Sequence, residues 1–112
     1  MEVKPREFLF YETASGHVPC REWLDGIEQT NSELYGVLLN RLDRVEDGNF
    51  GDCKPVGEGV SELRIDVDQG YRIYFGEDGD FVVLLLGDIK GTRRTQAKNI
   101  KRARSFWSDY NA

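Results

Sequence analysis

Apolar and polar side chains alternate over residues 61–67 and again over 71–75, and this pattern constrains the fold more than any other feature of the chain. Leu63 and Ile65 are flanked by polar residues, which is the two-residue period of a strand with one buried and one polar face. Two such runs separated by residues 68–70 predict an antiparallel hairpin. A slip of one residue would turn charged side chains into the core, so the pattern fixes which side chains share a face.

The polar face of this hairpin carries Arg64 and Arg72. With a three-residue loop at 68–70, Arg64 lies opposite Tyr74 and Asp66 lies opposite Arg72, which makes the two arginines diagonal neighbours. One interpretation is a phosphate-binding site, because the planar guanidinium fork grips two phosphate oxygens. The other is structural, with an Asp66–Arg72 ion pair and a stacking contact between Arg64 and Tyr74.

The rest of the chain predicts an α+β fold with the element order β-α-α-β-β-β-α. A helical hairpin near the N-terminus and a C-terminal helix would pack on a mainly antiparallel sheet. The 112 residues suit one core, so we expect a single domain over residues 1–112. Thr30 and Glu33 have the spacing of a capping box at the start of the second helix. The other expected elements are a strand at 8–11, a helix beginning at Pro19, an end to the second helix at Asp47-Gly48-Asn49, a strand at 81–86 after an Asp78-Gly79 turn, and a helix from about Arg93.

Charge is distributed unevenly along the chain. The net charge of −5 combines −11 over residues 1–88, which hold 19 acidic and 8 basic side chains, with +6 over residues 89–112. A basic block of this kind is typical of a surface that binds polyanions, and the alternative is a solvated helix face. The block comprises Lys90, Arg93, Arg94, Lys98, Lys101, Arg102 and Arg104.

The cysteines and the single histidine indicate neither a metal site nor a cofactor. Cys20 and Cys53 have no C-x-x-C spacing and fit unpaired thiols in a reducing compartment, while His17 has no evident partners for metal binding or a catalytic triad. The first residues lack a basic segment followed by an apolar one, and no apolar run approaches the roughly 18 residues of a membrane span. We therefore expect a cytoplasmic protein without a signal peptide, membrane contact, metal or cofactor.

Several motifs, taken in order, resemble a known family. Glu62-Leu63-Arg64, then Gly70-Tyr71-Arg72 and then Lys90 resemble the HigB-type branch of the RelE/ParE toxin superfamily, the phage-derived addiction-module killer proteins. The resemblance covers most of the chain and implies a RelE-like fold. Further matching residues are Trp23-Leu24, Arg41-Leu42, Gly48-Asn49, Leu84-Leu85-Leu86-Gly87, Gln96, Ile100 and Ala103.

This resemblance implies the toxin of a type II toxin–antitoxin module, a ribosome-dependent mRNA endonuclease that inhibits translation. It also implies the partners: the ribosome and mRNA, a cognate helix-turn-helix antitoxin, and operator DNA reached only through that antitoxin. The implied reaction is attack by a ribose 2′-hydroxyl on the adjacent phosphate, without a metal.

The roles implied by the resemblance fall on named residues. Arg64 and Arg72 would stabilise the developing phosphorane, and Lys90 would transfer a proton or contact the phosphate. The remaining expected RNA contacts are Lys54, Tyr74, Arg93, Arg94 and Lys98.

Two other functions are compatible with the same fold, because function depends on the site rather than on the fold. One is a ParE-like, non-enzymatic inhibitor of DNA gyrase, and the other is an inactive relative that only binds its antitoxin.

The sequence also departs from the family in two places. Residues 91–95 lengthen the spacing between Lys90 and Gln96, and Asn99 stands where an acidic residue is common.

Overall fold

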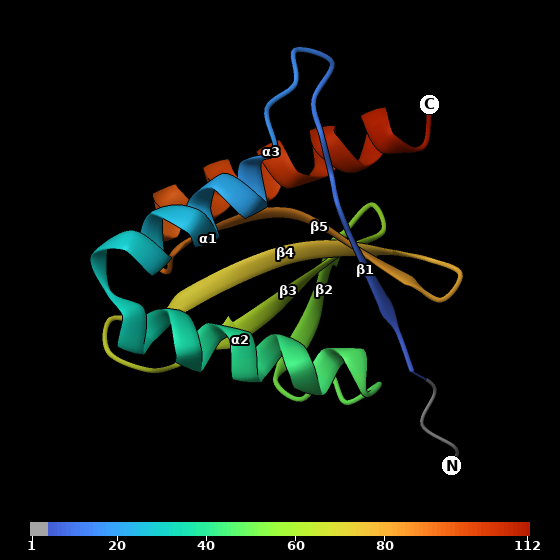
Figure 1. The fold of residues 1–112 in the computed structure, drawn as a ribbon. Coiled ribbons are helices and arrows are strands. Elements are labelled where there is room, and N and C mark those ends of the chain that lie inside the picture. Colours follow the sequence, from blue (N-terminus) through green and yellow to red (C-terminus); the bar gives the residue numbers. More distant parts are fainter. Residues whose placement is uncertain (1–4) are drawn as a thin grey trace.

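The computed structural model describes residues 5–112 as a five-stranded sheet with helices on both faces (Figure 1). The strand order is β1-β5-β4-β3-β2, with β1 parallel to β5 and all other neighbours antiparallel. Residues 1–4, on which the expected absence of a signal peptide partly rests, lie outside the described residues. The elements are β1 (Glu7–Phe10), α1 (Pro19–Thr30), α2 (Ser32–Glu46), β2 (Cys53–Gly57), β3 (Val60–Ile65), β4 (Tyr71–Asp78), β5 (Phe81–Ile89) and α3 (Arg93–Tyr110).

The predicted α+β class, the mainly antiparallel sheet and the three helices are confirmed, but the predicted element order is wrong. The order is β-α-α-β-β-β-β-α, because β2 precedes the predicted hairpin. Strand β2 contains Pro55 and lacks a clear alternation of apolar and polar residues. Proline cannot donate a hydrogen bond to a neighbouring strand and is tolerated at a sheet edge, which is where β2 lies. Pro55, which argues against a strand when the sequence is read alone, is therefore compatible with the edge position of β2.

Helix α2 begins one residue later than the capping-box prediction placed it. The N-cap is Asn31, whose side-chain oxygen accepts a hydrogen bond from the backbone N–H of Leu34 at 3.1 Å. Thr30 instead ends α1, and its hydroxyl donates to the carbonyl of Gly26 at 2.9 Å. The predicted start of α1 at Pro19 and the predicted end of α2 before Gly48 are confirmed.

The predicted register of the β3–β4 hairpin is shifted by two residues. Arg64 pairs directly with Arg72, and Glu62 pairs with Tyr74. The cause is a longer loop, because residues 66–70 leave the strands and Asp68 adopts a left-handed conformation with φ of 52°. A shift of two residues preserves the faces of the strands, so the predicted separation of apolar and polar sides survives. Its consequence is that the two arginines are direct cross-strand neighbours.

The two faces of the sheet bury separate cores. Helices α1 and α2 cover the face that carries Leu63 and Ile73, while α3 packs its Ala103 on the opposite face. Strand β5 is buried on both sides, which explains its unbroken apolar sequence. Trp107 of α3 lies on Gly76, where an added Cβ would come within 2.5 Å of the indole ring. This close approach holds α3 against the centre of the sheet.

Polar contacts fix the C-terminal half of α3. The Arg104 side chain donates to the backbone carbonyl of Val56 in β2, with Nε at 3.1 Å. The Tyr11 hydroxyl donates to Asp109 at 2.6 Å. Within residues 5–112, no helix has both the length and the apolar character required to cross a bilayer.

Candidate functional site

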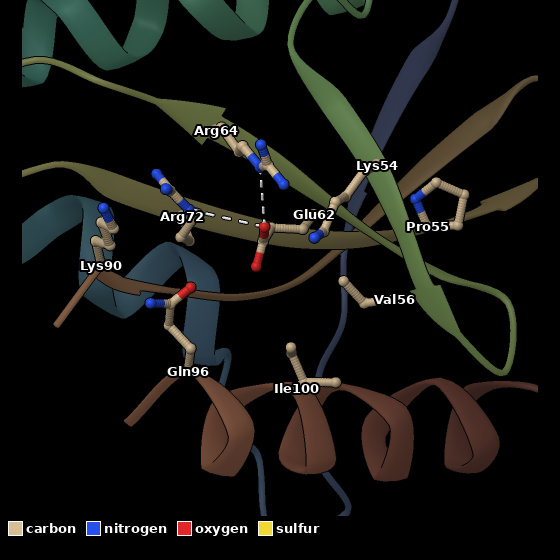
Figure 2. Close-up of a pocket in the computed structure, with 9 residues that line it drawn as sticks. All are labelled: Lys54, Pro55, Val56, Glu62, Arg64, Arg72, Lys90, Gln96 and Ile100. Atoms are coloured by element: carbon tan, nitrogen blue, oxygen red, sulfur yellow. Dashed lines mark hydrogen bonds and ion pairs between the residues drawn. The ribbon is translucent and has the colours of Figure 1, made fainter. Parts of the chain in front are cut away.

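A groove of about 470 Å³ lies between the polar face of the sheet and the N-terminal half of α3 (Figure 2). Strands β2, β3 and β4 supply its cationic side, and α3 supplies the opposite wall through Gln96 and Ile100. Of the predicted site residues, the structure brings Arg64, Arg72, Lys90 and Lys54 together here. The complete lining is Lys54, Pro55, Val56, Glu62, Arg64, Arg72, Lys90, Gln96 and Ile100.

The local backbone explains why Lys90 reaches the two arginines although it follows a different strand. Its backbone N–H donates to the carbonyl of Gly70 at 2.9 Å, which ties the end of β5 to the β3–β4 loop. A Cβ at Gly70 would meet the Lys90 side chain at 3.3 Å, so the lysine stem packs directly on this glycine. The glycine has φ of 85°, a conformation that other residues rarely adopt. Gly70 therefore serves both the turn and the placement of the lysine.

The centre of the groove is a carboxylate shared by two arginines. Oε1 of Glu62 lies 3.3 Å from Nε of Arg64 and 3.7 Å from Nε of Arg72. Only 4% of the Glu62 side chain is exposed. Removing a carboxylate from water is costly unless charged partners compensate, and the two guanidinium groups provide that compensation. The polar face thus carries four cations and one buried anion among the groove-lining residues.

Arg72 is the more tightly held of the two arginines. Its Nη1 donates to Asp66 at 3.1 Å and to the carbonyl of Tyr71 at 2.9 Å, and its side chain is 6% exposed. Arg64 is 31% exposed, and its Nη1 lies 4.0 Å from the carboxylate of Asp52. Arg64 consequently presents a more accessible guanidinium to the groove, while Arg72, its cross-strand neighbour, is more firmly anchored.

The structural interpretation of the hairpin is correct in one contact and wrong in the other. The predicted ion pair between Asp66 and Arg72 is present. The predicted stack of Arg64 on Tyr74 is absent, because the register shift places Tyr74 opposite Glu62. The side chain of Tyr74 is fully buried in the core under α3 and does not line the groove, in contrast to its expected role in contacting RNA. Burial, followed by the neighbouring Glu62 carboxylate, raises the pKa of Tyr74.

The structure does not bring the other predicted RNA contacts into the groove. Arg93, Arg94 and Lys98 are exposed on the first two turns of α3 and are absent from the groove lining. Helix α3 starts at a cap formed by Thr92, whose side-chain oxygen accepts from the backbone N–H of Thr95 at 3.2 Å. These cations consequently form an exposed surface separate from the groove lining.

Asn99 is buried, and its amide donates to Asp88 at 2.7 Å. Asp88 belongs to β5 and pairs with Arg72 across the strands. An acid at position 99 would place two carboxylates in contact, which disfavours ionisation of both. Asparagine is therefore the compatible residue beside an aspartate at position 88.

Sequence reasoning missed Glu62 as a site residue. The signal was available in part, because Glu62 and Arg64 have the two-residue spacing that puts them on the same face of a strand. Its burial could not be read from the strand alone, since it depends on α3 covering that face. Within residues 5–112, no cluster of three or more histidine, cysteine, aspartate or glutamate side chains could hold a metal ion.

The fold and the groove define a small α+β protein with a cationic site built on a sheet face. Residues 22–108 match the family of phage-derived Gp49-like proteins (DUF891). A protein of Haemophilus influenzae, described as uncharacterized, is 49% identical over 83 residues, covering 73% of this chain and 79% of the relative. The chain belongs to the Gp49-like family, and the matched region contains every residue that lines the groove.

Proposed function

We propose that this protein is the toxin of a type II toxin–antitoxin module, of the HigB type within the RelE/ParE superfamily, and that its groove cleaves mRNA on the ribosome. One observation carries the proposal. A single groove is lined by Arg64, Arg72 and Lys90, which come from three separate motifs of the sequence. Membership of a phage-derived family supports it. A protein that acted only by binding gyrase or an antitoxin would have no need of converging phosphate-binding groups on the sheet.

The arrangement of the groove suits attack by a ribose 2′-hydroxyl on the adjacent phosphate. The accessible guanidinium of Arg64 contacts the non-bridging oxygens, and the neighbouring Arg72 adds positive charge as the phosphorane forms. Preorganised cations of this kind stabilise the transition state more than the ground state, which is the condition for catalysis. Lys90 at the end of the groove is the candidate to protonate the leaving 5′-oxygen.

The composition of the groove also supports dependence on the ribosome. Its lining contains cations for the RNA backbone but no aromatic side chain, since Tyr74 is buried. Stacking on an aromatic ring is worth about 1–3 kcal/mol per base in proteins that bind single-stranded nucleic acid unaided. Without that contribution, the codon must be positioned by another structure, and the ribosomal A site provides one. The exposed cations Arg93, Arg94 and Lys98 are available for ribosomal RNA.

The proposed partners of the protein, besides the ribosome, are a helix-turn-helix antitoxin that neutralises it and operator DNA contacted only through that antitoxin. The acidic remainder of the chain, with −11 over residues 1–88, argues against direct binding to DNA.

The test is the order in which synthesis stops after induction without the antitoxin in a bacterium. Incorporation of labelled methionine should fall first, while thymidine incorporation continues. An Arg64→Ala variant produced at the same level is the matched control and should not arrest growth. Loss of thymidine incorporation with translation intact would identify a gyrase inhibitor, and no arrest at all would identify an inactive relative.

A further inference from the structure

Glu62 is the one acid among the residues lining the groove, and the proposed mechanism assigns it no function. In that mechanism the arginines stabilise the phosphorane and Lys90 protonates the leaving oxygen, but no group takes the proton from the attacking 2′-hydroxyl. We propose that the carboxylate of Glu62 is this general base. The inference rests on the proposed function and adds a catalytic residue to it.

The position of Glu62 relative to the arginines supports this role. In a reactive conformation the 2′-oxygen lies about 3–3.5 Å from the phosphorus, so base and phosphate clamp must be immediate neighbours. Nε of Arg64 and Nε of Arg72 lie 3.3 and 3.7 Å from the same oxygen, Oε1 of Glu62. Figure 2 shows the second carboxylate oxygen directed away from both arginines, into the space toward Ile100. That oxygen is not engaged by either arginine and is the one placed to accept a proton from a bound ribose, with the buried Tyr74 hydroxyl as the other polar neighbour of the carboxylate.

Other carboxylates near the groove are less suited to the task. Asp88 is held by the amide of Asn99 at 2.7 Å. Asp66 and Asp52 are absent from the groove lining, and their side chains are 63% and 55% exposed, so water competes for them. Glu62 alone combines contact with both arginines and a place in the lining, among the residues that the structure describes.

A purely structural role for Glu62 accounts poorly for its burial. A buried ion pair adds little net stability compared with well-packed apolar residues, because desolvation of the charges offsets their attraction. The charged and titratable groups facing Glu62 come from all neighbouring strands, whereas α3 contributes only the neutral Gln96 and Ile100. They are Lys54 on β2, Arg64 on β3, Arg72 and Tyr74 on β4, Lys90 after β5 and, beyond them, Asp88 on β5.

The proton balance of the step is complete with groups already in the groove. The 2′-hydroxyl gives its proton to Glu62 as the bond from O2′ to phosphorus forms. The bond from phosphorus to the 5′-oxygen breaks, and Lys90 supplies the proton that this oxygen requires. The products are a 2′,3′-cyclic phosphate and a 5′-hydroxyl, and exchange with water restores both side chains.

The test compares Glu62→Gln with the parent in single-turnover cleavage on programmed ribosomes. The amide keeps the shape of the side chain but cannot take the proton, so cleavage should slow on the order of 10²–10⁴-fold. Glu58→Gln on the neighbouring hairpin, 72% exposed and outside the groove, is the matched control and should cleave at the parental rate.

Two further measurements separate a base from a structural residue. Ribosomes carrying an mRNA with a 2′-deoxy nucleotide at the cleavage site should bind Glu62→Gln at least as tightly as the parent, because a negative charge beside the phosphate is removed. With a 5′-thio leaving group, which departs without protonation, Lys90→Ala should regain near-parental cleavage while Glu62→Gln stays slow. Should the amide reduce folding, Glu62→Asp retains a carboxylate and should recover part of the cleavage rate that Glu62→Gln loses.

The results distinguish failure of this inference from failure of the proposed function. Cleavage by Glu62→Gln at the parental rate would overturn the general-base role alone. The general-base role would also be overturned if Glu62→Gln bound the 2′-deoxy substrate more weakly than the parent and regained cleavage with the 5′-thio leaving group. Glu62 would then act only by maintaining the structure of the groove. A parent that leaves ribosome-bound mRNA intact would overturn both.

Discussion

Alanine substitutions of Arg64 and of Arg72 should have opposite balances of catalytic and structural effects. Arg64 is 31% exposed, and its removal leaves Glu62 still paired with Arg72. A partly exposed ion pair contributes at most about 1 kcal/mol to folding. Arg64→Ala should therefore lower the melting temperature by no more than about 4–8 °C, the shift that 1 kcal/mol produces in a domain of this size.

Cleavage should respond much more strongly to loss of Arg64. A preorganised donor that contacts developing charge in the transition state is worth about 2.7–4 kcal/mol, which corresponds to a loss of about 10²–10³-fold in rate. Arg64→Lys should recover little of this, because a point charge does not reproduce the planar fork.

Arg72→Ala should instead be costly for the fold. Its side chain is 6% exposed, and its removal empties a buried site and takes away the guanidinium that donates to Asp66 and to the carbonyl of Tyr71. Breaking a buried ion pair from one side costs about 3–5 kcal/mol. The melting temperature should fall by more than about 10 °C. Thermal melting by circular dichroism and single-turnover cleavage at a temperature where both variants are folded measure the two effects. An Arg64→Ala protein that cleaves at the parental rate, or an Arg72→Ala protein that melts with the parent, would refute this reasoning.

Three other results are expected. Neutralising Arg93, Arg94 and Lys98 together should weaken ribosome binding and reduce the log–log salt slope by about one unit for each phosphate that the protein no longer neutralises, while an unchanged slope would identify a solvated helix face. Gly76→Ala should destabilise the protein, because the new methyl group meets Trp107 at 2.5 Å, whereas Gly26→Ala, with nothing within 4 Å, should not; equal melting temperatures would contradict the packing. Burial, then the hydrogen bond to Asp109, raises the pKa of Tyr11 from 10.0 to about 12, so this tyrosine contributes stability below pH 10 that is lost as the pH rises toward 12. Tyr11→Phe should flatten that part of the stability–pH curve, and an unchanged slope in denaturant titrations would exclude the contribution.

Much of the fold was predictable because the alternating pattern determines which side chains share a face. The period alone assigns Leu63 and Ile65 to the core and Arg64 to the polar face, and a shift of two residues in register changes none of these assignments. The shift itself was not predictable, since it depends on the left-handed backbone of Asp68. The edge strand around Pro55 was missed because its residues have neither alternation nor strand propensity, and pairing with β3 forms it.

The site was predictable in part for the same reason. The two-residue alternation of side chains along each strand puts Arg64 and Arg72 on one face, and the loop after β5 brings Lys90 to them. The burial of Glu62 and Tyr74 depends on α3 packing over that face, an interaction between residues distant in sequence. No pattern within the strands indicates such packing.

The most direct measurement of the central claim is the chemistry of the ends produced on a programmed ribosome by the purified protein. Attack by the ribose 2′-hydroxyl predicts cleavage within the A-site codon that leaves a 2′,3′-cyclic phosphate and a 5′-hydroxyl, and predicts their disappearance in Arg64→Ala. Intact mRNA, or ends bearing a 3′-hydroxyl and a 5′-phosphate, would contradict the account.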